Sequence, residues 1–543
     1  MATGREDSAA GGRAERLRRG AAGMDRGGRH RPRPLRPAAA ALLRRREAEV
    51  LMMIDRRRTL FAALAAGGAA WAPALPGMAQ TRPAEPSPKV TAPLSAFIAG
   101  AQAAPIQEEI LDLGRRHILD TLASVVACRD LEPSVLARRY ALAQSGDARR
   151  SAVTILGTRS RAALTDAVFA SAMTAHGAEI NDFIPSAFVQ PGPSIVSAAI
   201  GLAEQRKKSG AQVLRAVLAG YELAGRVPKA IGNENLRRAN IANHGIGPVF
   251  GTAAAAASII GLPEDRISDL LTYCAQQASG SWQWMLDVEH IEKSFVFAGM
   301  GARNGLQAAL FVEQGFRGVR DSFDNPAGWL NSAIFTGHDA NRSYLVEDLG
   351  KRWEMPATAY KRYPVGGPTQ PAVHGLLQLL PKIDREHVAS VKIAMPGRWQ
   401  AFRDAAMPAL NLRYLTAIIL LDGRLDFVSA QSLERMHGDA RAKALMARVD
   451  VVHDPAQEHA PGEERTESAR VEVVHQDGRR LEVFVPYVVG FPSHPMSKAD
   501  VEAKALELMT PGLGAARARA VVDQVWNIDR LADGGRLAAL IAA

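Results

Sequence analysis

Apolar residues recur at spacings of three and four from about residue 92 to residue 355. Such spacing places them on one stripe of an α-helix and predicts helices that pack on one another. The pattern is clearest in residues 107–127, 162–175, 193–207 and 211–227. An Ala-rich run, GIGPVFGTAAAAASIIGLPEDRISDLLTYCAQQ, predicts two further helices with a break at Gly261-Leu262-Pro263. We therefore expect an all-helical domain over residues 90–356.

The pattern changes after Pro356. Alternating apolar and polar positions in HVASVKIAMP, RVDVVHD and ARVEVVHQDGRRLEVFVPYVV predict β-strands, and Asp477-Gly478 favours a hairpin. Helical spacing returns at residues 369–381, 412–421 and 498–509. The predicted fold is therefore mostly α, with a large all-helical domain and a smaller α+β lid domain over residues 357–495. Residues 496–543 are expected to form helices that rejoin the helical domain.

Positive charge is concentrated at the start of the chain. The whole chain has a net charge of +10, and residues 1–58 contain sixteen arginines against seven acidic residues, which leaves +9 there. The remaining residues are therefore close to neutral. A nearly neutral body gives no electrostatic reason to expect nucleic-acid binding.

A possible targeting segment follows that basic region. Arg56-Arg57-Arg58-Thr59-Leu60-Phe61 precedes ALAAGGAAWAPALPGMA, which is typical of a twin-arginine export signal over residues 52–79, cleaved after Ala79. A functional signal predicts a periplasmic protein. The alternative is an ordinary N-terminal amphipathic or anchoring helix, and a non-functional leader would leave the protein cytoplasmic. Residues 1–51 are low in complexity and predict a disordered or mis-called extension.

The mature chain shows no pattern for a membrane span, a disulfide framework or a metal. No later segment has the roughly 20 apolar residues that cross a bilayer. Two cysteines, Cys128 and Cys274, are too few for a disulfide scaffold, and both lie in apolar helical segments. Neither CxxC nor HExxH occurs, so no metal ligand is predicted.

Polar side chains gather between two Ala-rich helical segments, in HGAEINDFIPSAFVQPGP. The candidates in this stretch are His176, Glu179, Asn181, Asp182 and Gln190. Asn and Asp often cap helices and form turns, so a cap is the simplest alternative. An imidazole and two carboxylates within seven residues favour a site over a cap.

Four further candidates lie in later stretches. His244 lies at the Gly-rich start of a predicted helix, where an imidazole can act as acid or base or bind an anion. The alternative is a structural role, which is more common for a lone histidine. Lys293 lies beside an apolar run and could bind a carboxylate; the alternative is a surface lysine next to Glu292. Lys361 belongs to a basic, aromatic loop that opens the second domain, and Tyr414 begins a buried helix.

The order of these stretches resembles the MmgE/PrpD family. The resemblance rests on a His-x-x-acid-x-x-Asp stretch, a His-Gly helix start, a Lys before A-G-x-x-A-x-x-G, a Lys-x-Tyr-Pro loop and a Tyr before LLDG. It covers roughly residues 92–510. The family includes 2-methylcitrate dehydratase, cis-aconitate decarboxylase and an iminodisuccinate epimerase. The resemblance implies a homodimer, a site between the two domains, and no metal or organic cofactor.

The same resemblance assigns roles to residues. It implies that Glu179, His244, Lys293 and Tyr414 are catalytic, with Glu179 or His244 as base and Tyr414 or His244 as acid. The expected substrate-binding residues are His176, Asn181, Asp182, Gln190, Lys361 and Gln370, together with Arg303, whose guanidinium could hold a carboxylate. The chain departs from the family pattern at Gln190 and Gln370, where the family has histidines. The spacing from Lys293 to Ala298-Gly299 is also one residue longer.

The function that the resemblance implies is a dehydratase-type lyase. Such an enzyme would act on a small di- or tricarboxylic acid and remove a proton from the carbon next to a carboxylate. Within the same family, an isomerase, an epimerase or a decarboxylase is the alternative. Since an amide cannot exchange protons as an imidazole does, the two glutamines also leave open a non-catalytic, exported binder of an organic acid.

Overall fold

The computed structural model describes residues 89–146, 152–337, 339–458 and 467–542. The predicted extension (1–51) and export signal (52–79) lie outside the described residues. Residues 86–543 form one compact unit. Within its described part, no helix is both long and apolar enough to cross a membrane. That part also contains no group of three or more His, Cys, Asp or Glu side chains arranged to hold a metal ion.

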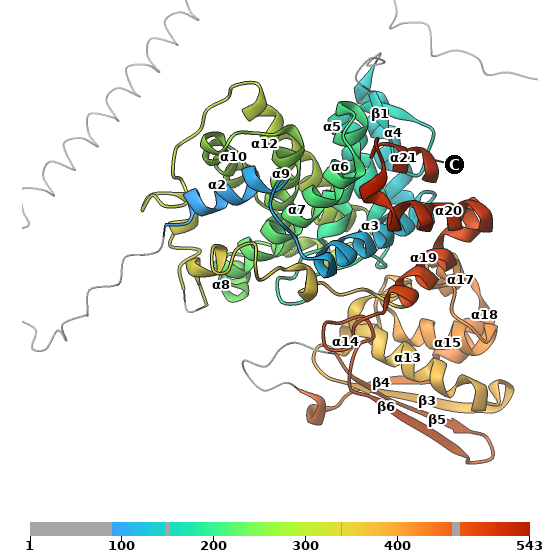
Figure 1. Ribbon diagram of the computed structural model, residues 1–543. Coiled ribbons are helices and arrows are strands. Elements are labelled where there is room, and N and C mark those ends of the chain that lie inside the picture. Colours follow the sequence, from blue (N-terminus) through green and yellow to red (C-terminus); the bar gives the residue numbers. More distant parts are fainter. Residues whose placement is uncertain (1–88, 147–151, 338, 459–466, 543) are drawn as a thin grey trace, which may run out of the picture. The chain divides into compact units, whose positions relative to one another are not determined.

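The first half of this unit is built almost entirely from helices (Figure 1). They are α2 (Thr91–Gly100), α3 (Glu108–Cys128), α4 (Glu132–Ser145), α5 (Leu164–Ala175), α6 (Pro191–Arg206), α7 (Gly210–Ile231), α8 (Asn233–Arg238), α9 (Gly247–Ile260), α10 (Glu264–Gln277), α11 (Ile291–Ser294) and α12 (Met300–Glu313). The predicted break falls where expected, because α9 ends at Ile260 and α10 begins at Glu264.

Helix α9 packs against α6, α7 and α12. Its Ala-rich sequence is buried on all sides, as expected for a helix surrounded by neighbours. Gly220 of α7 and Gly251 of α9 let the two backbones approach closely. A Cβ added at either glycine would lie within 3 Å of the other's carbonyl oxygen, at 2.9 and 2.7 Å.

One element of this half was not predicted. Residues 152–154 and 161–163 form a short antiparallel hairpin of β1 (Ala152–Thr154) and β2 (Arg161–Ala163). The expected helix over 162–175 therefore begins two residues later, at Leu164. Three-residue strands are too short to show an alternating pattern, which explains the error.

The second half contains a four-stranded sheet. Its strands are β3 (Val388–Met395), β4 (Val449–His453), β5 (Ala469–His475) and β6 (Arg480–Val485), in the order β4-β3-β5-β6. β3 runs parallel to β4 and antiparallel to β5, which pairs antiparallel with β6. Gly478 adopts a φ of 86° in the turn between β5 and β6, which confirms the predicted Asp-Gly hairpin.

Helices accompany this sheet and also close the chain. They are α13 (Gln370–Leu379), α14 (Gln400–Arg403), α15 (Leu412–Asp422), α16 (Phe427–Gln431), α17 (Leu433–Gly438), α18 (Ala440–Met446), α19 (Lys498–Leu513), α20 (Ala515–Trp526) and α21 (Arg536–Ile541). α13 packs on β5 and β6, while α19 packs on α3 of the first half. The fold is thus mostly helical with a smaller α+β part, as predicted.

Apolar side chains form two main cores. One contains residues of the first half together with residues of α19, α20 and α21. The other lies among α13, α15 and the sheet, over residues 365–473. The C-terminal helices therefore share a core with the first half and not with the sheet.

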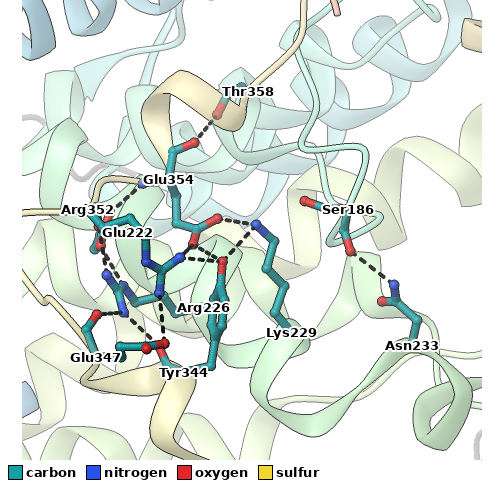
Figure 2. Close-up of polar contacts among 10 residues, drawn as sticks. All are labelled: Ser186, Glu222, Arg226, Lys229, Asn233, Tyr344, Glu347, Arg352, Glu354 and Thr358. Carbon is teal, nitrogen blue, oxygen red and sulfur yellow. Dashed lines mark hydrogen bonds and ion pairs between the residues drawn. The ribbon is translucent and has the colours of Figure 1, made fainter. Parts of the chain in front are cut away.

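A buried ion-pair network fixes the segment that leads from the first half to the second (Figure 2). Arg226 of α7 pairs with Glu222 at 2.5 Å, and both side chains are fully buried. The Arg226 guanidinium also donates to the backbone carbonyls of Tyr344, Glu347 and Arg352 at 2.6, 2.8 and 2.7 Å. Four hydrogen bonds of one arginine thus satisfy acceptors that would otherwise be buried without partners.

Candidate active site

Glu179 is the centre of a buried cluster of charges. It lies in the loop between α5 and α6, and its two carboxylate oxygens pair with different lysines. One oxygen pairs with Lys293 of α11, and the other accepts a hydrogen bond from Lys361 at 3.1 Å. All three side chains are at least nine-tenths buried. The structure therefore brings together three of the residues expected to form the site.

Backbone pairing holds Lys361 next to this loop. Phe183 and Ala359 form an isolated β-bridge, with N–H···O distances of 3.0 and 2.7 Å. The bridge fastens the stretch before Lys361 to the stretch after Glu179. Two segments of the chain thus form one ion pair, between residues that are 182 positions apart in sequence.

The two lysines decide the charge of Glu179. Burial by itself would raise the pKa of this carboxyl, but the ammonium groups of Lys293 and Lys361 hold it well below its usual range. Glu179 is therefore ionised. Burial lowers the pKa of Lys361, and the Glu179 carboxylate opposes that shift.

Three histidines surround these charges. His176 follows the last residue of α5, His244 belongs to a 3₁₀ turn (Asn243–Gly245), and His290 precedes α11 in a left-handed conformation with a φ of 64°. His290 Nε2 lies 3.0 Å from the His176 carbonyl oxygen and 3.3 Å from His176 Nδ1. Since a carbonyl only accepts, His290 carries its proton on Nε2 and His176 Nδ1 is an acceptor. His176 therefore carries its proton on Nε2.

All three imidazoles are neutral near pH 7. Burial, reinforced by Lys293, lowers the pKa of His244 to about 3 and that of His290 to about 4. Burial also lowers the pKa of His176 well below its usual range. His176 Nε2, His244 Nδ1 and His290 Nδ1 have no hydrogen-bond partner among the described residues. The cluster thus offers three buried nitrogens that could bind a polar ligand or exchange a proton with it.

Aromatic rings enclose one side of the cluster. Phe297 stacks on His244 with ring centroids 3.8 Å apart and planes 20° apart. Trp284 lies edge-on to His244 at 5.1 Å, and Lys293 Nζ lies 5.1 Å from the Trp284 ring. These rings exclude water from His244 and Lys293, which strengthens every electrostatic interaction between them.

Asp182 belongs to a neighbouring network and not to the lysine pair. Its carboxylate accepts from His117 Nδ1 at 2.8 Å, from the Tyr221 hydroxyl at 2.5 Å and from the Gly192 N–H at 3.2 Å. Asn181 donates to the Asp182 carbonyl at 2.8 Å, and its Oδ1 is buried without a partner in the described chain. Asp182 thus anchors the loop that carries Glu179, as well as the start of α6.

The other candidates lie in different surroundings. Gln190 precedes α6, and its Oε1 is buried without a partner in the described part of the chain. Gln370 bonds the backbone of Tyr363 and Val365, so both ends of its amide hold that loop. Binding of substrate by either glutamine stays a prediction.

Neither Tyr414 nor Arg303 contacts the cluster within the described chain. The Tyr414 hydroxyl donates to the Ser429 carbonyl at 2.7 Å in the α+β part. Arg303 lies near Asn304 and 5.9 Å from the ring of Phe169. Catalysis by Tyr414 and substrate binding by Arg303 therefore stay predictions that these contacts do not support.

Comparison with protein families decides the relationship of this chain. Residues 92–343 match the MmgE/PrpD N-terminal domain, and residues 363–528 match the MmgE/PrpD C-terminal domain. The chain belongs to the MmgE/PrpD family. The expected resemblance is thereby confirmed.

Curated members of the MmgE/PrpD family include several similar proteins. A cis-aconitate decarboxylase-like protein, oryM, of Aspergillus oryzae is 26% identical over 67% of this chain and 79% of its own length. A cis-aconitate decarboxylase of Aspergillus terreus is 24% identical over 68% of this chain and 79% of its own. The Homo sapiens cis-aconitate decarboxylase is 20% identical over 83% of this chain and 94% of its own. At these identities the reaction of this MmgE/PrpD chain does not follow from the names.

Sequence reasoning missed several residues that this family member places at the site. His290, Trp284 and Phe297 all contact predicted site residues. His290 is an isolated histidine in a loop, without a periodic neighbour to mark it. Phe297 has the appearance of an ordinary apolar residue, and only its place in the run after Lys293, before the A-G-x-x-A-x-x-G motif, could have marked it.

Proposed function

We propose that this protein is a lyase that acts on a small di- or tricarboxylic acid by acid–base chemistry at a carbon next to a carboxylate. The observation that carries the proposal is the buried Glu179 carboxylate between Lys293 and Lys361, beside three neutral histidines. Buried carboxylates and imidazoles with shifted pKa values are the groups that active sites use to move protons.

Charge balance supports an anionic substrate. Two ammonium groups pair with one carboxylate, and the histidines are neutral, so these side chains together carry a net charge of +1 in a buried place. The Asp287 carboxylate, which accepts from the Lys293 backbone N–H at 2.7 Å, offsets part of it. A substrate carboxylate would neutralise it. Each further carboxylate would favour protonation of a histidine, because a nearby negative charge raises the pKa of an imidazole.

Substrate binding would also change the basicity of Glu179. A substrate carboxylate competes with Glu179 for Lys293 and Lys361, and weaker pairing raises the pKa of the Glu179 carboxyl. Glu179 could then take a proton from carbon, while a histidine protonated by the arriving charge could give one back. In this proposal Lys293 and Lys361 hold the substrate, and Glu179 and His244 exchange protons with it.

Dehydration and decarboxylation place different demands on the same groups. Dehydration removes a proton from carbon and a hydroxide from its neighbour, which needs a base and an acid. Decarboxylation breaks a carbon–carbon bond, leaves the electron pair on carbon and then needs only a proton donor. The names of the curated relatives favour decarboxylation, and the replacement of two family histidines by Gln190 and Gln370 agrees with a smaller demand for proton carriers.

The products distinguish these reactions. Purified protein would be incubated with ¹³C-labelled citrate-, malate- and aconitate-like acids and followed by NMR. Loss of water would establish a dehydratase, release of labelled CO₂ a decarboxylase, and inversion alone an epimerase. Ligand-induced shifts without any reaction would overturn the lyase and leave a binder of organic acids.

A matched pair of variants links the reaction to the site. Glu179→Gln is expected to abolish turnover, whereas His374→Gln should retain it, because the described contacts of His374 are with Tyr363, Gln378 and Tyr487 and not with Glu179 or the two lysines. Equal rates in the two variants would contradict the proposed site.

A further inference from the structure

The segment that follows Lys293 contains one turn of π-helix. The turn Phe295–Gly299 joins α11 to α12, and the Met300 N–H donates to the Phe295 carbonyl five residues earlier. An α-helix absorbs one additional residue in this way without shifting the turns on either side. A one-residue longer spacing between Lys293 and Ala298-Gly299, as the family resemblance implies, would fit such a turn.

The π-turn presents Phe297 to the candidate site. The Phe297 ring stacks on His244 at 3.8 Å, meets His176 edge-on at 4.9 Å and lies 5.4 Å from Lys293 Nζ. Phe295, in the same turn, contacts Phe169 at 6.3 Å instead. Three predicted site residues thus share one apolar neighbour, which is itself 2% exposed.

We propose that Phe297 is a positioning residue that holds the His244 imidazole flat against its ring, where Nδ1 has no hydrogen-bond partner among the described residues. That the stacking of Phe297 on His244 serves catalysis rests on the proposed acid–base function. Stacked rings fix the plane of the imidazole, and Trp282 and Trp284 meet its edges at 5.7 and 5.1 Å. Since the Phe297 side chain has no hydrogen-bonding atoms, its contact with His244 does not occupy the unpartnered Nδ1.

Three charged side chains, one in α11 and two in loops, influence the pKa of His244. Lys293 and Lys361 oppose its protonation, and Glu179 favours it. These charges remain when Phe297 is replaced. A change in the His244 titration on replacing Phe297 would therefore report the loss of the stacked ring and the entry of water.

The experiment titrates the ring nitrogens of His244 by long-range ¹H–¹⁵N NMR in the intact protein, with His244→Gln to assign the signals. Phe297→Leu is expected to raise the pKa of His244 by at least about one unit and to mix its tautomers, because burial is the main cause of the shift. The control Phe295→Leu, in the same π-turn, should leave the pKa within about 0.3 unit. An unchanged pKa and tautomer in Phe297→Leu would overturn the proposal.

A measurement on the unmodified protein covers the case in which Phe297→Leu does not fold. The face of an aromatic ring shifts protons above it upfield, so the carbon-bound protons of His244 should resonate upfield of a free imidazole. Signals at the free position would overturn the stacking. Neither NMR measurement requires turnover. If the protein converted no acid, the proposed function would fail, but the stacking of Phe297 on His244 could still be tested.

Discussion

Glu179 is the residue on which the charge of the site depends. Its carboxylate is the partner of both buried lysines, and its own ionisation is maintained by them. A buried charge that loses its partner is far more costly than the pair itself is stabilising. The three side chains therefore act as a unit.

Replacing Glu179 by Gln should expose that dependence. We expect Glu179→Gln to lower the free energy of unfolding by about 3–5 kcal/mol, because Lys293 and Lys361 are then buried without a counter-charge. Urea unfolding followed by tryptophan fluorescence measures the change. The control is Glu507→Gln, which breaks a partly exposed pair with Arg362 and should cost less than about 1 kcal/mol. Equal costs in the two variants would show that the lysines do not depend on Glu179.

The buried histidines predict a loss of stability in mild acid. The pKa of His244 is lowered from 6.5 to about 3 in the folded protein. Between these values the unfolded chain binds a proton that the folded chain does not, so stability is retained above pH 6.5 and falls as the pH decreases. His244→Gln should reduce the slope of unfolding free energy against pH by about 1.4 kcal/mol per unit.

Urea titrations at several pH values between 4 and 6.5 would measure this slope. His437 is exposed, and His437→Gln should keep the slope of the unmodified protein. A slope unchanged in His244→Gln would mean that the imidazole is accessible to protons in the folded state.

At the scale of elements, the Arg226 network determines how the 344–354 segment leaves the helical part. The guanidinium joins α7 to three carbonyls of that segment (Figure 2). The segment leads on to the loop that carries Lys361. Its anchoring therefore supports the site from a distance.

Arg226→Met should test this anchoring. We expect a loss of at least about 3 kcal/mol in the free energy of unfolding, since Glu222 and three carbonyls lose a buried partner. Hydrogen exchange of residues 344–354 should also accelerate. Arg206→Met, which removes an exposed pair with Glu313, should cost under about 1 kcal/mol. Unchanged exchange in Arg226→Met would show that other contacts hold the segment.

The elements themselves could largely be read from the sequence. The helices expected over 107–127, 193–207 and 211–227 are α3, α6 and α7, which contain all of these residues except Gln107 and Lys207, because their apolar spacing decides their packing. The Asp-Gly hairpin followed from its turn residues. By contrast, the π-turn at Phe295–Gly299 has no periodic signature, and its aromatic residues resemble those of any buried helix.

The candidate site was predictable only in part. Sequence order and family resemblance pointed to Glu179, His244, Lys293 and Lys361, but the contacts among them depend on loops whose geometry no local pattern specifies. Tyr414 illustrates the limit, since its hydroxyl bonds within the α+β part and not at the cluster. A motif gives a residue's place in the chain, whereas its neighbours depend on the packing.

At the scale of the whole molecule, the segment over residues 52–79 predicts export. Arg56-Arg57-Arg58 and the uncharged run after them are typical of a twin-arginine signal. Expressed in a bacterium with this pathway, the protein should appear in the periplasm with Gln80 as its first residue. Changing Arg56, Arg57 and Arg58 to Lys should retain it in the cytoplasm. Fractionation and N-terminal sequencing measure both outcomes, and export of the Lys variant would contradict a twin-arginine signal.

The most direct test of the site is hydrogen exchange at carbon. Protein incubated in D₂O with a panel of di- and tricarboxylic acids should place deuterium on the carbon next to a carboxylate. We expect Glu179→Gln to abolish this incorporation and His374→Gln to leave its rate unchanged. NMR of the recovered acids measures the incorporation. Deuterium at that carbon, dependent on Glu179, is the predicted result. Incorporation that survives Glu179→Gln, or none with any acid, would contradict the account.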